Sequence, residues 1–526
     1  MTPGIRQQSL GLGLLALVLF SAGVYQQAAI GFDSRFVLFA QEMLRHGLSF
    51  FPTTYGEPYA DYSALSTVFI WLLSLPFGQV NSLSAWLPSA IAATVIVTLM
   101  YRLLAPYSKR WALLSIALML LTNTFVTETR AVSLDLMLAA VAFAVFYLGY
   151  VADHFDKPRR LGLIFALLVL GFGIRGPMGL VVPTAMLCSY YLLNRQWHRF
   201  FTFGVLATIV LAACIGVLLW LAHTSGGPAF VQDVIRMQFT GRMDGSEGAN
   251  DVLYYFTSSV GNYALAYPLA ILALIATCMS ARQAGPSLRL VQYCVAAALI
   301  VMIGLSIPLA KKARYMLPML PMAAIIAAYP FAVAQGRVFG WLRGVMQGLW
   351  LVIPALLIVA LLVARRHFPQ ELHSLAPTLI ILGVVQAIAL ALLMKPHWRA
   401  QGLAACAVVG LWSFYALTVE PLERRLYDTR NFSETTYAMI QKDPAPLVMY
   451  DMTKDGKGIK FMVNIGHDLQ PLFIPSVAGL EGLQGPLWLM MDEKAYQGLQ
   501  GTPFGELKPV LSGSFDKNDV VLLHRP

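Results

Sequence analysis

The residues of this sequence that could do chemistry are charged side chains beside long apolar runs. They are Asp33, Arg35, Asp61, Arg130, Asp135, Arg175, Lys311, Lys312 and Arg314. A charged group at the centre of a bilayer costs about 2.5–3.5 kcal/mol on insertion scales, so charges at the ends of spanning segments need a partner or a function. A single cation could simply extend to the lipid headgroups. Because acidic residues gain little there, the set as a whole indicates a site.

The cations of this set are suited to binding a phosphate. A guanidinium can donate two parallel hydrogen bonds to phosphate oxygens, whereas a lysine ammonium acts as a flexible point charge. A lipid phosphate or pyrophosphate is therefore the natural ligand for such cations at one membrane face. The residues predicted to bind it are Arg35, Arg130, Arg175, Lys311, Lys312 and Arg314.

Asp33 and Asp135 are the candidate catalytic residues. A carboxylate close to the phosphate could accept the proton of an attacking hydroxyl. Burial disfavours the ionised form of a carboxyl, and a neighbouring arginine favours it. Arg35 lies near Asp33 in the sequence, and Arg130 lies near Asp135, so each could serve in this way. In the alternative interpretation, each pair is an ion pair that only fixes a loop.

Two further segments could contact a substrate. Asp61 and Tyr62 belong to the run "GEPYADYSALS". Residues 230–251 carry Arg236 and Arg242 and end in a glycine-rich stretch, which fits either a flexible lid or an ordinary solvated loop.

Metal and disulfide chemistry are not indicated. The histidines are scattered, and the five cysteines fall inside apolar runs without paired spacing. We therefore expect neither a metal site nor a disulfide framework. The proposed chemistry requires no cofactor, and a divalent ion is neither required nor excluded.

The elements that position these residues must lie in a membrane. The chain has 526 residues, of which 58% are hydrophobic and 12% charged, and its mean hydropathy is +0.65. These values lie outside the range of soluble proteins. We expect about thirteen spanning helices, the first of them a retained helix rather than a removed signal peptide. They are predicted near residues 9–29, 81–105, 110–126, 133–152, 161–176, 178–194, 200–222, 257–280, 289–309, 315–334, 346–364, 375–394 and 401–419.

Loop charge predicts the orientation of these helices. If the N-terminus is cytoplasmic, the loops "YSKR", "DKPRR", "NRQWHR", "ARQAGPSLR", "GRVFGWLRG" and "KPHWR" are cytoplasmic as well, and each is basic. This agrees with the positive-inside rule. The formal net charge of +10 reflects such loops, and no basic tract interleaved with aromatic residues suggests a nucleic acid partner.

The predicted domain organisation follows from this orientation. Residues 1–420 form a transmembrane domain, with outer loops at 30–80 and 223–256. The first outer loop contains apolar stretches too short to span, which predicts helices lying in the membrane interface. Residues 421–526 return to a higher charge density with short alternating strands, which is typical of a small soluble α/β domain.

The motifs, taken in order, resemble those of GT-C type membrane glycosyltransferases that use polyprenyl-phosphate donors. The chain is similar to the bacterial lipid A aminoarabinose transferases and the protein O-mannosyltransferases. The resemblance rests on "FDSRFVLFAQEML", "YGEPYADYSALSTVFIWL", "RAVSLDLML", "LGFGIRGPMGLVVP", "LYYF" and "AKKARYMLPMLP", which follow one another in this order. It implies an all-α polytopic GT-C fold with a small C-terminal domain.

The resemblance also implies roles for individual residues. Asp33 corresponds to the family's catalytic first-loop acid and Asp135 to its second outer acid. Arg175 corresponds to the cation of a Lys-Gly-Pro motif. The late cations that meet the lipid phosphate correspond to Lys311, Lys312 and Arg314.

The sequence departs from the family pattern at two places. The family's adjacent Asp and Glu read Phe32-Asp33 here. Its Glu-Lys-Pro-Pro motif reads Asp61-Tyr62-Ser63-Ala64, so one phosphate-binding lysine is missing. Either Arg35 or Arg175 could compensate, or the donor could differ.

The function implied is transfer of a sugar from a polyprenyl-phosphate donor, such as an undecaprenyl-phosphate sugar, in the bacterial inner membrane. The acceptor would be periplasmic, such as lipid A, another glycan or a protein, and the active site and C-terminal domain would face the periplasm. One alternative is a lipid-linked sugar transporter or flippase, which would need polar residues along a path through the bilayer. Another is a scaffold that binds a partner through its C-terminal domain.

Overall fold

The computed structural model describes residues 3–24, 27–61, 65–243, 251–280, 285–333, 336–368 and 375–526, without the side chain of Arg242. The chain forms two compact units, each assembled from separate segments. The first unit comprises Met1–Gly23, Ala60–Ser66 and Trp86–Val419, and the second comprises Val24–Tyr59, Thr67–Ala85 and Glu420–Pro526. The first outer loop is therefore grouped largely with the C-terminal segment.

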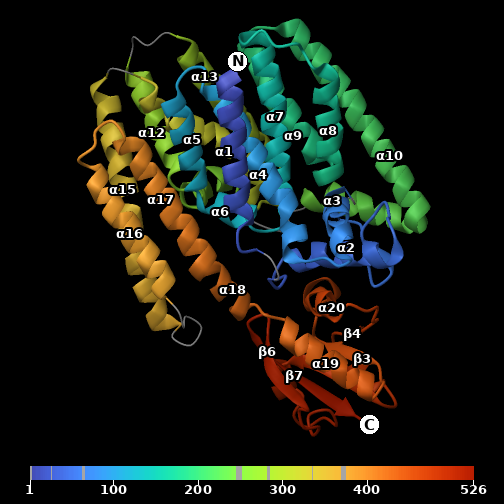
Figure 1. Ribbon diagram of the computed structural model, residues 1–526. Coiled ribbons are helices and arrows are strands. Elements are labelled where there is room, and N and C mark those ends of the chain that lie inside the picture. The colour runs from blue at the N-terminus through green and yellow to red at the C-terminus, as the bar shows by residue number, and fades with distance from the viewer. Residues whose placement is uncertain are drawn as a thin grey trace. The chain divides into compact units, whose positions relative to one another are not determined.

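The first unit is a bundle of helices (Figure 1). Its helices are α1 (Pro3–Ser21), α4 (Ser82–Leu104), α5 (Lys109–Leu120), α6 (Asn123–Thr129), α7 (Leu134–His154), α8 (Leu161–Arg175), α9 (Pro177–Leu193), α10 (Trp197–Gln238), α11 (Tyr254–Asn262), α12 (Ala266–Met279), α13 (Pro286–Ser306), α14 (Leu320–Ala327), α15 (Arg337–His367), α16 (Ala376–Leu392) and α17 (Arg399–Phe414). Short turns of other helix types are η2 (Thr240–Arg242), η3 (Ala313–Met319), η4 (Tyr329–Phe331) and η5 (Tyr415–Val419).

Several of these helices have the length and composition of membrane spans. Among the described residues, seven are long and apolar enough to cross a bilayer, or up to nine if each of two bent pairs is one span. Among the same residues, four shorter apolar helices add to these, namely Leu65–Phe77, α8, α9 and α16. The chain is thus a mostly helical membrane protein, as predicted, whereas the count of thirteen spans stays a prediction.

Buried tryptophans tie central helices of the first unit together. The indole of Trp111 in α5 donates to the carbonyl of Ile325 in α14 at 2.9 Å. The indole of Trp412 in α17 donates to the carbonyl of Leu120 at the end of α5 at 3.0 Å. A buried indole needs such an acceptor because an unpaired donor in an apolar interior is costly. The same bonds therefore fix the axial position of α5 against its neighbours.

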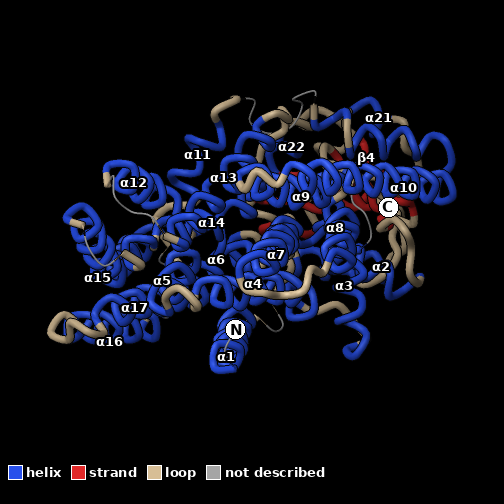
Figure 2. The backbone as a smooth tube through the Cα atoms, turned by 90° about the horizontal axis from the view of Figure 1, so that it is seen from above, coloured by secondary structure: helices blue, strands red, loops and turns tan. Residues whose placement is uncertain are grey.

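Helices α7, α8 and α9 pack side by side (Figure 2). The turn between α8 and α9 is tight because Gly176 adopts φ 62° and Pro177 starts the next helix at once. Gly171 and Gly179 bring the two backbones into contact, since a Cβ atom on Gly171 would lie 2.1 Å from the carbonyl oxygen of Gly179. This glycine pair lets the two helices run close together up to the turn.

Helix α10 differs from the prediction of a loop at residues 223–256. It continues to Gln238, with one non-helical residue at Gly227, whose φ of 72° and ψ of −167° change the direction of the chain. Pro228 follows and starts the second helical part without needing a backbone donor. The glycine and proline pair therefore divides one long helix into two parts instead of ending it.

The second unit combines helices from the first outer loop with a mixed sheet. The loop contributes α2 (Asp33–His46), a hairpin of β1 (Thr53–Thr54) and β2 (Glu57–Pro58), α3 (Leu65–Ser74) and η1 (Leu75–Phe77). The C-terminal segment contributes α18 (Glu420–Leu426), α19 (Arg430–Lys442), η6 (Lys454–Gly458), α20 (Ile459–Ile465), α21 (Val477–Glu481) and α22 (Glu493–Gln497). Its strands are β3 (Leu447–Tyr450), β4 (Leu472–Ile474), β5 (Leu487–Asp492), β6 (Leu511–Phe515) and β7 (Asn518–Arg525).

The five strands of the C-terminal segment have the order β4-β3-β5-β7-β6. Strand β3 pairs in parallel with β4 and β5, whereas β7 pairs antiparallel with β5 and β6. The central strands β3 and β5 are almost wholly buried, as expected for strands covered on both faces. Their side chains form a core around Val448, Leu489 and Leu523, against which Leu480 and Phe504 pack.

Candidate functional site

Asp135 lies between two arginines in the first unit. Its Oδ1 lies 2.9 Å from Nε of Arg175, and its Oδ2 lies 3.1 Å from Nε of Arg314. The side chains of Asp135 and Arg175 are each only 4% exposed, and that of Arg314 is 22% exposed. We call these three residues the Asp135 cluster. It brings together three of the predicted site residues from distant parts of the chain.

Helix ends position the Asp135 cluster. Ser133 caps α7 by accepting a hydrogen bond from the backbone of Leu136, which places Asp135 in the first turn. Arg175 is the last residue of α8. An acid at a helix N-terminus and a base at a C-terminus both interact favourably with the helix dipole. The packing of α7 against α8 therefore brings the N-terminal end of α7, which carries the acid, next to the C-terminal end of α8, which carries the arginine.

The arginine of α8 also contacts an aromatic ring that the sequence analysis missed. The guanidinium carbon of Arg175 lies 5.1 Å from the ring centroid of Tyr315, which directly follows Arg314 in η3. Such a cation–π contact fixes the plane of the guanidinium. The only sequence signal for Tyr315 is its position within "AKKARYMLPMLP".

Tyr315 borders an apolar pocket with a volume of about 240 Å³. The lining residues are Met178, Gln238, Phe239, Met243, Leu305, Pro308, Ala310 and Tyr315. The side chain of Gln238, at the end of α10, approaches Gly176 and donates a hydrogen bond to the backbone carbonyl of Asp61. A mostly apolar pocket with few polar groups is typical of a site for an apolar ligand.

Lys311 lies next to this pocket in the sequence, directly after the lining residue Ala310. It is only 2% exposed, and among the described residues its Nζ has no hydrogen-bond partner. A buried charge without a partner costs several kcal/mol. The prediction that Lys311 binds a phosphate is compatible with this position.

The other cations predicted to bind phosphate have different surroundings. The guanidinium of Arg130 donates to the carbonyls of Phe20 at 3.3 Å and Ala22 at 2.9 Å, at the end of α1. Lys312 is partly buried and precedes η3. Arg236 is exposed on the second part of α10. Tyr62 and the side chain of Arg242 lie outside the described residues.

Two tyrosines, one in α11 and one directly after it, contact the segment Lys311–Tyr315. The hydroxyl of Tyr263 donates to the carbonyl of Ala313 at 2.9 Å, and the buried Tyr255 faces the backbone of Lys312. Tyr255 belongs to the "LYYF" motif, and its residue type alone gave no role for it. These contacts hold the Lys311–Tyr315 segment in place.

Asp33 and Arg35 belong to the second unit. Asp33 is the first residue of α2 and is 8% exposed. The guanidinium of Arg35 donates to the carbonyl of Asp455 at 2.9 Å. It also lies 5.8 Å from the ring centroid of Phe32 and 5.3 Å from that of Tyr59. The first turn of α2 is thus anchored to the C-terminal segment through Arg35.

Three residues of the second unit group closely enough to suggest a cation site. They are Glu42, His46 and Asp468. However, Nη2 of Arg45 lies 3.4 Å from Glu42 and 3.5 Å from Asp468, and Nε2 of His46 lies 3.0 Å from Asp468. Burial raises the pKa of the Glu42 carboxyl, although Arg45 and a hydrogen bond from Thr53 act in the opposite direction. We interpret the group as an ion-pair cluster, because its guanidinium already supplies the positive charge.

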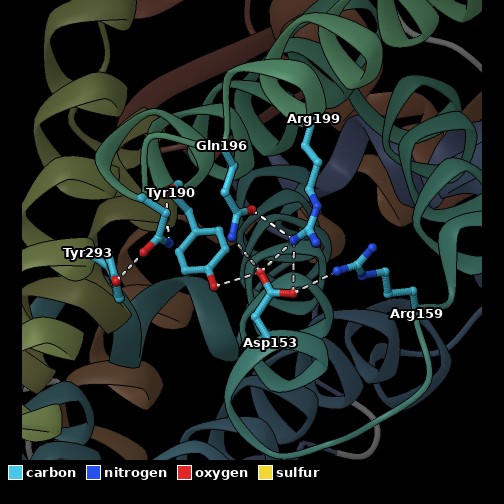
Figure 3. Close-up of polar contacts among 7 residues, drawn as sticks. Asp153, Arg159, Tyr190, Gln196, Arg199 and Tyr293 are labelled. Carbon is cyan, nitrogen blue, oxygen red and sulfur yellow. Dashed lines mark hydrogen bonds and ion pairs between the residues drawn. The ribbon is translucent and has the colours of Figure 1, made fainter.

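A second polar cluster, absent from the sequence analysis, lies at the other end of α7 (Figure 3). Asp153 accepts from Nη1 of Arg199 at 3.0 Å, from Gln196 at 3.2 Å and from the hydroxyl of Tyr190 at 3.1 Å, and Arg159 lies 3.4 Å away. Arg159, Gln196 and Arg199 come from two of the basic loops that predicted the orientation of the helices, whereas Tyr190 lies in α9. Both carboxylate oxygens of Asp153 accept hydrogen bonds. We therefore interpret this cluster as a structural contact that joins α7, α9 and α10.

Comparisons with known proteins agree with the resemblance noted in the sequence. Residues 62–220 match the family model described as dolichyl-phosphate-mannose-protein mannosyltransferase. No curated protein matches the chain significantly. The crystal structure of ArnT from Cupriavidus metallidurans bound to undecaprenyl phosphate superposes with a TM-score of 0.72 at 18% identity, covering 98% of each chain. The apo structure of the same protein gives 0.73 at 17% identity, again covering 98% of each chain. The predicted resemblance is thus confirmed, and this chain has the fold of ArnT.

Proposed function

We propose that this protein is an integral membrane glycosyltransferase of the bacterial inner membrane. Its donor would be a sugar linked to a polyprenyl phosphate such as undecaprenyl phosphate, and its acceptor lipid A, another glycan or a protein in the periplasm. The mannosyltransferase family match and the ArnT-like fold support transferase chemistry. The undecaprenyl phosphate bound to ArnT supports the class of donor.

Lys311 is the observation that carries this proposal. Its buried ammonium has no hydrogen-bond partner among the described residues, and Lys311 directly follows Ala310, which lines an apolar pocket. Arg175 contacts Tyr315, which lines the same pocket. A polyprenyl phosphate has the matching parts, an anionic headgroup and a hydrocarbon chain. We assign the phosphate to Lys311, Arg175 and Arg314, and the first part of the chain to the pocket.

The reaction we propose is a displacement at the anomeric carbon of the sugar. An acceptor hydroxyl forms the new bond to that carbon, the bond from carbon to the phosphate oxygen breaks, and polyprenyl phosphate leaves. The cations stabilise the negative charge that grows on the leaving phosphate. Asp33 accepts the proton of the acceptor. Asp135 orients Arg175 and Arg314, whose guanidinium groups it holds.

We propose that this reaction requires no cofactor, because its bonds and charges balance with the side chains named above. A divalent ion is neither required nor excluded by this chemistry. We also propose thirteen spans, a cytoplasmic N-terminus and a periplasmic face for both the site and the C-terminal domain. The basic loops support this orientation.

A lipid-linked sugar transporter is the alternative function. It would need charged or polar groups along a path through the membrane. Among the described residues of the first unit, the buried charged side chains are Arg130, Asp135, Arg175 and Lys311. The first three lie at helix ends, and Lys311 lies in the segment between α13 and η3. Charges at helix ends favour chemistry at one membrane face over transport through the bundle.

Replacing Lys311 tests the donor site. Lys311→Ala should weaken binding of a polyprenyl-phosphate sugar by about 2–5 kcal/mol, because a desolvated, charge-assisted contact is lost. The matched control is Lys395→Ala, which removes an exposed lysine between α16 and α17. Donor affinity and sugar transfer would be measured on purified protein in lipid nanodiscs. Equal affinities for the two variants would contradict the assignment of the phosphate to Lys311.

A further inference from the structure

The first outer loop and the C-terminal segment interlock within the second unit. The hairpin β1–β2 places Tyr55 at its tip, where Tyr55 has φ 56° and Gly56 has φ 77°. Two central residues with positive φ are the requirement of the tight turns that suit two-residue hairpin loops. A turn held in this geometry presents the tyrosine side chain in a fixed direction.

Tyr55 docks onto a turn of the C-terminal segment. Its hydroxyl donates to the carbonyl of Lys454 at 3.0 Å, and its ring meets that of Phe473 edge-on with centroids 5.8 Å apart. The residue is 9% exposed, and burial, together with the charges of Asp455 and Glu42, raises the pKa of its hydroxyl. Tyr55 therefore stays a neutral hydrogen-bond donor over the physiological range. We call residues Lys454–Gly458, which form η6, the docking turn.

Two further contacts join the docking turn to the loop. Nζ of Lys454 lies 2.7 Å from the carboxylate of Glu57 and 5.2 Å from the centroid of the Tyr55 ring. Both ends of the Lys454–Glu57 pair are largely exposed, so it adds orientation more than stability. The carbonyl of Asp455 accepts from Arg35, as described above. The docking turn thus holds the hairpin tip and the first turn of α2 at the same time.

The C-terminal segment contacts helix α2 along its length as well as at its first turn. The side-chain amide of Gln41 donates to the carbonyl of Val463 in α20 at 3.1 Å, and α2 packs against α20. Asp33 stands at the end of α2 that Arg35 anchors. Because a general base must lie within hydrogen-bond reach of the proton it takes, small rotations of this helix would change the rate.

We propose that the docking turn is a positioning element for the transfer reaction. By holding Tyr55 and Arg35, it fixes the orientation of Asp33, so the C-terminal domain takes part in catalysis without contacting the sugar. This inference rests on the proposed function and extends it to the domain that the sequence left without a role. The docking turn holds Tyr55 and Arg35 through its backbone, because both side chains donate to main-chain carbonyls of the turn.

Gly458 offers a substitution that disturbs the contact between the docking turn and the groups packed against it. Its φ of −58° is compatible with any residue, so alanine brings no backbone strain. A Cβ atom there would lie 2.5 Å from the Tyr55 hydroxyl and 2.7 Å from the Phe473 ring, so these groups must move. The matched control is Gly482→Ala in the same segment, with φ −71° and a nearest Cβ contact of 3.7 Å.

The first readout is sugar transfer by the full chain in nanodiscs. We expect Gly458→Ala to lower turnover by about 10–100-fold at unchanged donor affinity, because a misplaced base slows the chemical step while the phosphate site is intact. Gly482→Ala should match the wild type. Removing the clashing hydroxyl with Tyr55→Phe in the Gly458→Ala background should restore part of the turnover. A folded Gly458→Ala protein with wild-type turnover would overturn the positioning role.

The second readout does not depend on activity. Amide hydrogen exchange in the first turn of α2 should speed up in Gly458→Ala and stay unchanged in Gly482→Ala. Unchanged exchange there would also overturn the proposal. If Gly458→Ala does not fold, Tyr55→Phe alone, which removes only the hydrogen bond, serves in both measurements with a smaller expected effect. Wild-type protein that transfers no sugar from polyprenyl-phosphate donors would refute the proposed function, and the exchange data would still decide the anchoring of α2.

Discussion

Asp135 and Asp33 were expected to play similar parts, and their surroundings separate them. Both oxygens of Asp135 face guanidinium groups, those of Arg175 and Arg314. The two oxygens of this carboxylate are thus both engaged by cations, which suits a role in holding those cations in place. Asp33 heads a helix in a different unit. We therefore keep Asp33 as the proposed base and give Asp135 the role of orienting the cations.

Isosteric amides distinguish these roles. Asp33→Asn should lower turnover by about 10²–10⁴-fold with donor affinity retained, because the amide keeps the size of the side chain but cannot accept the proton. Asp135→Asn should instead weaken donor affinity, since Arg175 and Arg314 lose the anion that orients them. Affinity and turnover would be measured separately on purified variants. The reverse pattern, with turnover lost at unchanged affinity only in Asp135→Asn, would exchange the two assignments.

The sequence predicted the types of these residues better than their partners. Arg130 was paired with Asp135 because the two are neighbours in the sequence, yet its guanidinium donates to carbonyls at the end of α1. Asp135 meets Arg175 and Arg314, which are remote in sequence and adjacent only through helix packing. Charge beside an apolar run can be recognised locally, whereas the direction of a side chain at a helix end depends on the tertiary structure.

At the scale of elements, the position of Arg175 depends on how closely α8 and α9 approach. Gly171 and Gly179 face one another with no room for a side chain. A larger residue would separate the helices just before the turn at Gly176 and shift Arg175 away from Asp135. The packing of two backbones thus controls the geometry of the proposed phosphate site.

Alanine substitutions within α8 test this dependence. Gly171→Ala should lower the melting temperature and weaken donor binding, because its Cβ atom would overlap the carbonyl of Gly179. Gly162→Ala, in the first turn of the same helix, has nothing within 4 Å of its Cβ position and should leave both unchanged. Thermal unfolding and donor titration provide the two measurements. Identical behaviour of the two variants would mean that the helices can separate at no cost.

Element boundaries were predicted well where apolar runs are uninterrupted and less well at glycine and proline. The predicted span at 133–152 is α7, Leu134–His154. The predicted loop after residue 222 is helical to Gln238, because Gly227 and Pro228 redirect the chain and then start a new helical part. A glycine followed by proline is compatible with either a loop or a kinked helix. Which of the two forms depends on the tertiary contacts of the residues that follow Pro228.

For the whole molecule, the proposed orientation in the membrane rests on the distribution of basic loops. An odd number of spans places the C-terminal domain opposite the N-terminus. A periplasm-active reporter fused after Pro526 should therefore be active, and a reporter that functions only in the cytoplasm should be silent. Fusions in the basic 395–398 loop, between α16 and α17, should give the opposite result. The same reporter response at both positions would refute the predicted topology.

The sequence did not predict that the first outer loop and the C-terminal segment form one unit. Charge density and strand patterns mark the C-terminal segment, but no local signal marks Tyr55 or Arg35 as its partners. Their contacts are made to backbone carbonyls of Lys454 and Asp455, and a carbonyl acceptor leaves no trace in residue type. Burial on both faces of β3 and β5 likewise depends on the helices that cover them.

The hydrogen bond between Tyr55 and Lys454 joins residues 399 positions apart, and this separation constrains biogenesis. The hairpin emerges early in synthesis, whereas its docking turn emerges after every span of the first unit. Contacts between such distant segments form slowly, because a long loop must close before they can stabilise it. The second unit can therefore be completed only at the end of synthesis. Until then the Tyr55 ring has no docking surface, so its exposure distinguishes an unfinished chain from a mature one.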